Sequence, residues 1–269
     1  MKLYTDSEGI PYKDFYEKDT TYKGQFSELG QKFYQGYADI IRRYTSVPSL
    51  ILDAGCGFGG VIEQLDKNRK IIGIDWSQRF LEEAKRRIAN GKFIRADLCN
   101  LPVSDNSIDF VGSYNVIEHV YSAEKFLKEV KRILNKNGKL LIITHNNDSP
   151  LMPLLVFYYS KKYKFKKGHA MYMSLPELLI SEIRQVIKFA RVCLSRKFTF
   201  KYRKFNPDLL EYIHDDAICD TSYFMIRYLK NNGFKIVKNM AHPVTSIKYA
   251  FAKMFPYIFT TTYIIAEKV

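Results

Sequence analysis

The sequence predicts an α/β protein built on a doubly wound parallel sheet, with a mostly helical insertion after the fifth strand. Two observations carry this prediction. Short apolar runs and amphipathic stretches alternate along residues 48–145, as they do where parallel strands are joined by helices on both faces of a sheet. Residues 151–206 then break the alternation with a composition of their own, which indicates an insert.

The first expected helix spans residues 22–45, because aliphatic and aromatic side chains recur there at spacings of three and four. This stripe comprises Phe26, Leu29, Phe33, Tyr37, Ile40 and Ile41. Pro48 ends the helix, since proline lacks the N–H group that would continue it. Residues 49–54 (SLILDA) are apolar and lead into glycines, a pattern typical of a buried parallel strand.

Helices and strands alternate after this first strand. We expect strands at residues 70–75, 93–96, 108–114 and 139–144, and helices at residues 60–68, 77–90 and 122–134. Ser77 is the expected N-cap of its helix, and the Asn137-Gly138 turn precedes the fifth strand. Beyond the insert we expect a helix at residues 221–232, ended by Gly233, and strands at residues 234–237 and 262–266.

The chain therefore divides into four expected segments. They are an N-terminal helical cap at residues 1–47, a cofactor-binding core at residues 48–150, a basic, aromatic, helical lid at residues 151–219, and the C-terminal part of the core at residues 220–269. Neither an internal repeat nor a low-complexity linker separates them.

Positive charge is concentrated in the insert. The chain holds 42 Lys and Arg against 28 Asp and Glu, a formal net charge of +14. Residues 151–206 hold 13 basic and 2 acidic side chains, so +11 of this charge lies there, interleaved with Phe and Tyr. Such a segment suits an anionic surface, either a membrane or a nucleic acid. A solvated basic face over a small satellite core would have the same composition.

Composition excludes several protein classes. A hydrophobic fraction of 46% excludes a disordered chain, and four scattered cysteines without a C-x-x-C pair imply neither a disulfide scaffold nor a zinc ribbon. The first residues lack the apolar stretch of a secretory signal. The longest apolar run, residues 151–159, is too short to cross a bilayer. We therefore expect a cytoplasmic protein with peripheral contact to a membrane.

A glycine-rich loop, DAGCGFGG at residues 53–60, follows the first strand. Glycines allow a tight turn and a close approach to a ligand, and a helix N-terminus offers unpaired N–H groups. Gly55, Gly57 and Gly60 also fit the dinucleotide pattern G-x-G-x-x-G. Asp75 lies 20 residues after Gly55, where a carboxylate holds a ribose. The loop therefore predicts nucleoside binding and leaves the kind of nucleoside open.

Three further features discriminate between nucleosides. Asp53, directly before the glycines, would repel a pyrophosphate but suits a ligand with an amino group and a sulfonium. Asp97 closes the third strand, where a carboxylate accepts a hydrogen bond from an adenine amino group. The fourth strand continues into SYNVIEHV at residues 113–120.

Together these motifs resemble the class I S-adenosylmethionine-dependent methyltransferases, and in wording the type 11 branch that includes the ubiquinone and menaquinone enzymes. The resemblance covers residues 48–145, with a similar tail at residues 221–268. It implies a Rossmann-like sheet of seven strands with the last strand antiparallel, and S-adenosyl-L-methionine as the cofactor.

The resemblance also implies which residues bind the cofactor. They are Asp53, Gly55, Cys56, Gly57, Gly59, Asp75, Trp76, Asp97, Leu98 and Asn115. The glycine loop would hold the methionine part, and Asp75 both ribose hydroxyls. Asp97 and Leu98 would recognise the adenine edge, with Trp76 along the ring unless it serves only packing. Asn115 would contact the cofactor near its sulfur. The loop cysteine is expected as a small residue and not as a nucleophile.

Two histidines are the expected catalytic residues. Methyl transfer from a sulfonium is a one-step displacement, which the enzyme promotes mainly by aligning the reactants. A hydroxyl acceptor also needs a general base, and histidine is the usual choice. His119 follows the fourth strand and His145 the fifth, at the carboxyl ends where ligands of such sheets bind.

A metal site is not expected. The run from Asn115 to Glu118 and His119 is similar to the Glu-x-x-Glu-His set of ubiquinone-pathway O-methyltransferases and of small-RNA 2′-O-methyltransferases, but Asn115 replaces the first Glu. Two remaining ligands do not make a site without further donors. Glu118 is expected to brace the following helix instead.

The expected function is O-methylation of a small hydrophobic or lipid-linked acceptor. Residues 166–169 (KKGH) and 174–179 (SLPELL) are similar to the insert of the ubiquinone-pathway enzymes. As a partner, an anionic membrane is therefore favoured over a nucleic acid. The alternatives are a sugar or natural-product acceptor, an RNA methyltransferase with the insert as its groove, and a regulatory protein that binds the cofactor without catalysis.

Overall fold

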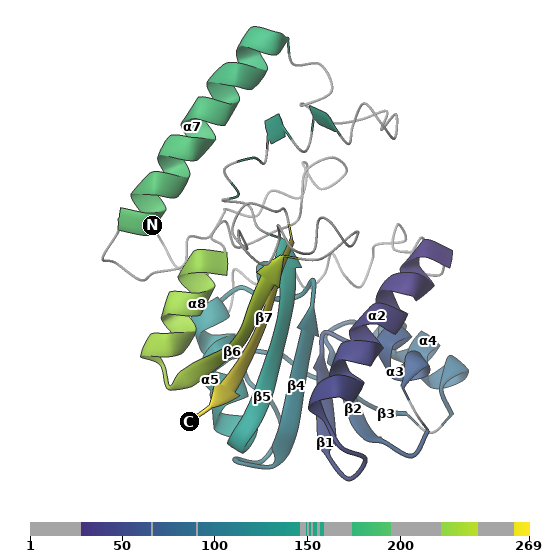
Figure 1. Ribbon diagram of the computed structural model, residues 1–269. Helices are drawn as coiled ribbons and strands as arrows, with labels where there is room; N and C mark the ends of the chain where they lie inside the picture. The colour runs from purple at the N-terminus through teal and green to yellow at the C-terminus, as the bar shows by residue number, and fades with distance from the viewer. Residues whose placement is uncertain are drawn as a thin grey trace. The chain divides into compact units, whose positions relative to one another are not determined.

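The computed structural model describes residues 28–65, 67–89, 91–145, 149, 151, 153–154, 157–158, 174–194, 222–241 and 261–269 (Figure 1). The start of the first expected helix and the basic runs at residues 161–167 and 195–206 lie outside these residues. The expected lid is therefore described only in part.

Seven strands form one sheet in the order β3-β2-β1-β4-β5-β7-β6. They are β1 (Leu50–Ala54), β2 (Lys70–Asp75), β3 (Lys92–Arg95), β4 (Ile108–Tyr114), β5 (Leu134–His145), β6 (Phe234–Ala241) and β7 (Thr261–Lys268). β1 runs parallel to both neighbours, since Ile51 pairs with Ile71 of β2 and with Phe110 of β4. The last strand, β7, is antiparallel, so the sheet is mixed (Figure 1). The expected α/β fold with seven strands is confirmed.

The helices expected at residues 60–68, 77–90, 122–134 and 221–232 begin within one residue of their predicted positions. The helices of the described residues are α2 (Glu28–Tyr44), α3 (Gly60–Gln64), α4 (Gln78–Arg87), the short 3-10 helix η2 (Ile117–His119), α5 (Ala123–Ile133), α7 (Leu175–Leu194) and α8 (Ser222–Asn231). Ser77 caps α4 by accepting a hydrogen bond from the N–H of Phe80, and Ser122 caps α5 in the same way from Lys125. The predicted N-cap at Ser77 is confirmed.

The core of the first part of the chain lies between the sheet and amphipathic helices. In α5, Phe126, Leu127, Val130 and Ile133 are all buried, at the three-to-four spacing of one helical face. β4 is buried along nearly all of its length, which matches a parallel strand covered on both faces. These elements hold the carboxyl ends of the central strands in place.

Two details differ from the sequence-based expectations. The fifth strand begins at Leu134 and runs through the Asn137-Gly138 pair, which was expected to be a turn before it. Asn137 takes a left-handed φ of 64°, and a Cβ on Gly138 would lie 2.8 Å from the carbonyl oxygen of Asn135, so the pair marks an irregularity inside the strand. In α2, Phe33 of the expected buried stripe is 44% exposed, whereas Tyr37 and Ile41 are buried.

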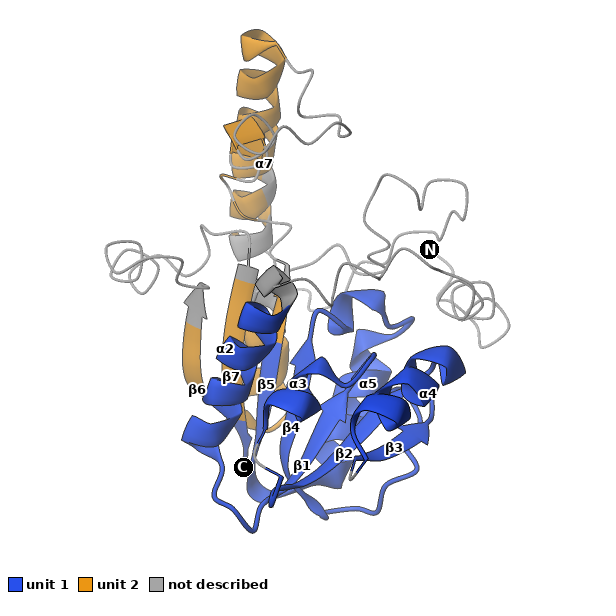
Figure 2. Cartoon of the chain, turned by 90° about the vertical axis from the view of Figure 1, so that its right-hand side faces the viewer, with its two compact units in different colours: residues 1–142, 267–269 blue, residues 143–266 orange. Residues whose placement is uncertain are grey.

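The chain forms two compact units, residues 1–142 with 267–269, and residues 143–266 (Figure 2). The four segments expected from the sequence stay a prediction. Among the helices that the structure describes, none combines the length and the apolar character needed to cross a membrane.

Candidate functional site

The carboxyl ends of β1, β2 and β4 lie at one edge of the sheet, because β1 is parallel to both of its neighbours. The chain leaves β1 toward β2 on one side, and β4 lies on the other side. The edge above β1 is thus a topological switch point, where open α/β sheets bind their ligands.

The glycine loop after β1 depends on left-handed backbone conformations. Gly55 and Gly59 have φ angles of 76° and 75°. The N–H groups of Gly55 and Cys56 both donate to the carbonyl of Ile74 in β2, at 2.7 and 3.0 Å. A Cβ on Gly55 would lie 2.4 Å from Cγ2 of Val116, so only glycine lets the loop approach the segment after β4 this closely.

Asp75, at the end of β2, ties the glycine loop to the next helix. Its Oδ2 accepts a hydrogen bond from the N–H of Gly57 at 2.8 Å, and its Oδ1 accepts one from the N–H of Ser77 at 2.9 Å. A carboxylate oxygen has a second lone pair, so both oxygens can still accept hydrogen bonds from a ligand. The carboxylate is therefore held in a fixed orientation at the mouth of the switch point.

Asp53, at the end of β1, is buried, with 3% of its surface exposed. Among the residues that the structure describes, no hydrogen-bond donor reaches its Oδ2 atom. Burial, and then the nearby Asp75 carboxylate, raise the pKa of Asp53 from 3.8 to about 7. Since a buried, unpaired carboxylate is costly, this group is suited to receive a cationic ligand atom that carries hydrogen-bond donors.

Cys56 contributes no reactive group to the loop. Its side chain packs with Ile62, Leu81 and Phe93 in the core below the loop. Burial raises the pKa of the thiol well above its ordinary value, which disfavours the reactive thiolate.

The end of β3 carries the residues expected at the adenine. Oδ1 of Asp97 accepts a hydrogen bond from the N–H of Cys99 at 2.8 Å, which fixes the turn that contains the buried Leu98. The guanidinium of Arg95 lies over the ring of Trp76, 5.2 Å from the ring centroid, and its Nε donates to the carbonyl of Trp76. One face of the indole is thus occupied by the guanidinium of Arg95.

Asn115 and His119 follow β4. Asn115 has a left-handed φ of 49°, and its Oδ1 is buried without a hydrogen-bond donor among the described residues. His119 lies in η2 and is partly exposed. Glu118 is buried and contributes to the raised pKa of Tyr114, after the larger effect of burial. The described residues contain no group of three His, Cys, Asp or Glu side chains that could hold a metal ion.

His145 is the last residue of β5, and its side chain lies outside the described part of the structure. The roles predicted for His119 and His145 stay predictions.

Two tyrosines of α2 belong to the same edge and were not predicted as site residues. A Cβ on Gly60 would lie 2.5 Å from the Tyr34 ring, so Tyr34 covers the start of α3 beside the glycine loop. Burial, and then Tyr114 and Asp53, raise the pKa of Tyr34 to about 12, which keeps its phenol neutral. The ring of Tyr37 lies 5.2 Å from that of Tyr114. The signal in the sequence was the pair of adjacent aromatic residues, Phe33 and Tyr34, of which only the first was assigned to the stripe.

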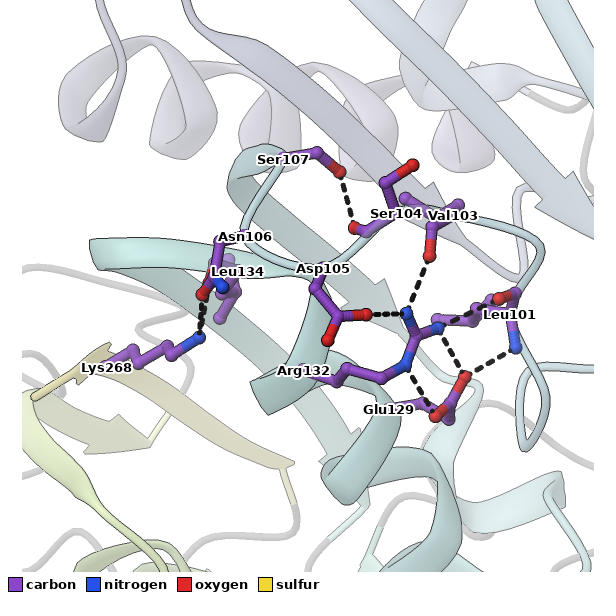
Figure 3. A network of polar contacts seen from close by, with 10 residues as sticks. All are labelled: Leu101, Val103, Ser104, Asp105, Asn106, Ser107, Glu129, Arg132, Leu134 and Lys268. Atoms are coloured by element: carbon purple, nitrogen blue, oxygen red, sulfur yellow. Dashed lines mark hydrogen bonds and ion pairs between the residues drawn. The ribbon is translucent and has the colours of Figure 1, made fainter.

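A network on α5 holds the segment that follows the expected adenine site (Figure 3). Arg132 donates to the carbonyls of Leu101 and Val103 at 2.9 and 2.7 Å. It also pairs with Glu129 at 2.8 Å and with Asp105 at 2.6 Å. Glu129 in turn accepts from the N–H of Leu101 at 2.8 Å, and its hydrogen bond with Arg132 lowers its pKa. One helix therefore sets the path of residues 101–105.

Sequence comparisons agree with this arrangement. Residues 52–142 match a protein family described as a methyltransferase domain. A probable S-adenosylmethionine-dependent methyltransferase of Mycolicibacterium smegmatis is 32% identical over 111 residues, which are 38% of this chain and 43% of that protein. Demethylmenaquinone methyltransferase of Thermotoga maritima is 32% identical over 99 residues, which are 36% of this chain and 43% of that protein.

Solved structures share the fold. The crystal structure of an S-adenosylmethionine-dependent methyltransferase from Mesorhizobium loti has a TM-score of 0.57 and 16% sequence identity, and the match covers 87% of this chain and 100% of that chain. This chain spans about two fifths of the length of the curated relatives it matches. The match, residues 52–142, nevertheless includes the glycine loop, Asp75, Asp97 and the segment after β4. Residues 52–142 are therefore similar to a methyltransferase domain, and the solved structures share the fold.

Proposed function

We propose that the chain is an S-adenosylmethionine-dependent methyltransferase that methylates an oxygen of a small hydrophobic or lipid-linked acceptor. The observation that carries the proposal is the buried Asp53 carboxylate, whose Oδ2 has no donor among the described residues. The cofactor offers an ammonium group that can fill this position, because an ammonium supplies both charge and N–H donors. A pyrophosphate would meet a repelling carboxylate there.

The remaining cofactor contacts follow from the strand ends. Asp75 is oriented by its two backbone hydrogen bonds and keeps lone pairs for the ribose hydroxyls. Asp97 and Leu98 would bind the adenine edge, with Trp76 along the ring. The buried Oδ1 of Asn115 lies on the segment that abuts Gly55 through Val116, so it is suited to the methionine end.

When bound, S-adenosylmethionine supplies a methyl group that is already activated by the positive sulfur. The chain's own residues then have to exclude water, hold the acceptor oxygen in line with the methyl carbon and remove the acceptor's proton. Tyr34 supports the first task, since its ring covers the start of α3 beside the glycine loop. His119, on the segment after β4, is suited to take the proton, and His145 is the second choice.

The acceptor class is supported by the insert and by the relatives. Demethylmenaquinone methyltransferase of Thermotoga maritima, by its name, acts on a quinone with a hydrophobic tail. The apolar and basic composition of residues 151–206 suits an acceptor of this kind held at an anionic interface.

The experiment has two stages. Calorimetry with S-adenosylmethionine and with NADH tests the cofactor, and we expect binding of the first alone. The protein is then incubated with cofactor labelled in its methyl group and with a polyprenylated hydroquinone, a water-soluble catechol or RNA. We expect label on an oxygen of the hydroquinone, located by NMR. Label on a ring carbon would contradict O-methylation. Label on RNA alone would favour the alternative of an RNA methyltransferase. Tight binding of NADH would contradict S-adenosylmethionine as the cofactor.

A further inference from the structure

We propose that α7 docks on an anionic lipid surface through an exposed aliphatic face. This inference extends the proposed function, because the enzyme would meet a lipid-linked acceptor at such a surface. Only this link to the acceptor rests on the proposed function. The docking itself follows from the exposure and charge of residues 174–194 and from the composition of the flanking sequence.

Ser174 and Glu177 form side-chain contacts at the N-terminus of α7. The hydroxyl and the N–H group of Ser174 both donate to Oε2 of Glu177, at 2.8 and 2.7 Å. The N–H of Leu178 donates to the carbonyl of Ser174. A helix capped in this way starts at a defined residue, so the face that it presents is also defined.

One face of α7 carries large aliphatic side chains in contact with solvent. They are Leu175, Leu179, Ile180, Ile183, Val186, Ile187 and Leu194, which are between 46% and 83% exposed. At 3.6 residues per turn, these positions all lie within an arc of roughly 140° along one side of the helix. Leu178, by contrast, is buried, so the helix also has a side that is shielded from solvent. Contiguous exposed apolar side chains of this kind mark an interaction surface.

Charge indicates what this face meets. Arg184 and Arg191 are exposed and seven residues apart, and they border the aliphatic face. Both acidic side chains of residues 151–206 are held by the chain itself: Glu177 accepts from Ser174, and Oε2 of Glu182 accepts from the N–H of Leu154 at 3.1 Å. By sequence, residues 151–206 hold 13 basic and 2 acidic side chains, so the segment that contains the aliphatic face is strongly positive.

These properties favour a lipid surface over other partners. A second copy of the chain would bring the same net charge of +14 to the contact and be repelled. A single nucleic-acid strand stacks its bases on aromatic rings, whereas the exposed face of α7 is aliphatic. An interfacial helix needs both features found here, an apolar face for the acyl boundary and basic residues for the headgroups.

The test compares three variants of the full chain in vesicle flotation. The face variant is Leu179→Gln with Ile183→Gln and Val186→Gln. Its matched control is Val47→Gln with Val237→Gln, because these aliphatic residues are exposed to a similar degree, 47% and 42%, but lie outside α7. The charge variant changes Lys161, Lys162, Lys164, Lys166 and Lys167 to Gln. Vesicles contain phosphatidylcholine alone or with phosphatidylglycerol, at low and at physiological salt.

We expect the unmodified chain to bind vesicles with phosphatidylglycerol and not phosphatidylcholine alone, more weakly at physiological salt. The face variant should bind at least tenfold more weakly, the control as the unmodified chain does, and the charge variant should lose the preference for phosphatidylglycerol. Calorimetry should give unchanged cofactor affinity in all three, which separates a failure of docking from a failure of the proposed function.

Equal vesicle binding by the face variant and the control would overturn the proposal. It would also be overturned if the unmodified chain bound no vesicles and instead formed dimers, or bound RNA, through the same aliphatic residues.

Discussion

Cofactor binding should strengthen as the pH rises toward 7.5, because the buried Asp53 carboxyl must ionise to pair with the ammonium group. Its pKa in the free protein is raised to about 7, mainly by burial and then by Asp75. With this value, about 9% of the molecules hold an ionised Asp53 at pH 6 and about 76% at pH 7.5. If only these molecules bind tightly, the apparent affinity rises roughly eightfold over this range.

Roughly 60–75% of the cofactor molecules still carry a charged amino group at pH 7.5, since α-amino groups titrate near 7.7 to 8.0. This partial loss reduces the expected rise in affinity to roughly five- to sixfold. Calorimetry measures the affinity at each pH. Repeating it near pH 6 in two buffers of different ionisation enthalpy counts the protons released, and we expect about 0.9 per bound cofactor. Asp53→Asn is the control, because it keeps the shape of the side chain and removes its titration.

The same raised pKa has the opposite effect on the stability of the free protein. Between 3.8, the ordinary value, and about 7, the folded state keeps the proton that the unfolded state has lost. The free energy of unfolding should therefore fall as the pH rises through this window, and the fall should be smaller in Asp53→Asn. An affinity that does not change with pH, or a pH dependence that Asp53→Asn retains in full, would refute the reasoning.

Three further predictions concern single side chains. Asp75→Ala should weaken S-adenosylmethionine binding at least tenfold, about 1.4 kcal/mol, because hydrogen bonds to a charged group are lost; unchanged affinity in calorimetry would contradict the ribose assignment. His119→Ala or His145→Ala should lower turnover more than cofactor affinity, since a base acts on the acceptor's proton; full turnover in both would indicate an acceptor that needs no base. Arg132→Met should lower the free energy of unfolding by about 2–3 kcal/mol in denaturant titration, because two carbonyls and Glu129 lose their donor. Arg86→Met, which breaks an exposed ion pair with Glu83, should lower the free energy of unfolding by less than about 1 kcal/mol. Equal losses in the two variants would show that the further hydrogen bonds of Arg132 contribute nothing.

Much of the fold follows from local patterns. β2 and β4 begin and end at the predicted residues, 70–75 and 108–114, because each is an apolar run bounded by polar turn residues. The start of β5 was missed because an Asn-Gly pair is usually a turn, and only the packing around Gly138 shows that it lies within the strand. The local sequence cannot reveal that the Asn-Gly pair continues the strand, because the residues that pack around the pair are set by the tertiary structure.

The site could be predicted in its residue types but not in its contacts. Spacing in the sequence places Asp53 and Asp75 at strand ends, yet the two backbone hydrogen bonds that orient Asp75 and the absence of a donor at Oδ2 of Asp53 depend on the loop path. Tyr34 was missed because the aliphatic and aromatic stripe of a helix indicates only which side chains pack against the core. It does not indicate that a neighbouring, partly exposed side chain lies beside the ligand site. The partners of Arg132 on residues 101–105 are likewise non-local.

The first compact unit is completed by residues 267–269, although residues 143–266 form the other unit. Nζ of Lys139 pairs with Glu267 at 3.3 Å, and Nζ of Lys268 donates to Oδ1 of Asn106 at 2.7 Å and to the carbonyl of Leu134 (Figure 3). During synthesis, residues 1–142 leave the ribosome well before the residues that complete their hydrogen bonding. This unit can therefore be completed only after residues 143–266 have been made, and the long sequence separation of its closing contacts should make that step slow relative to helix formation.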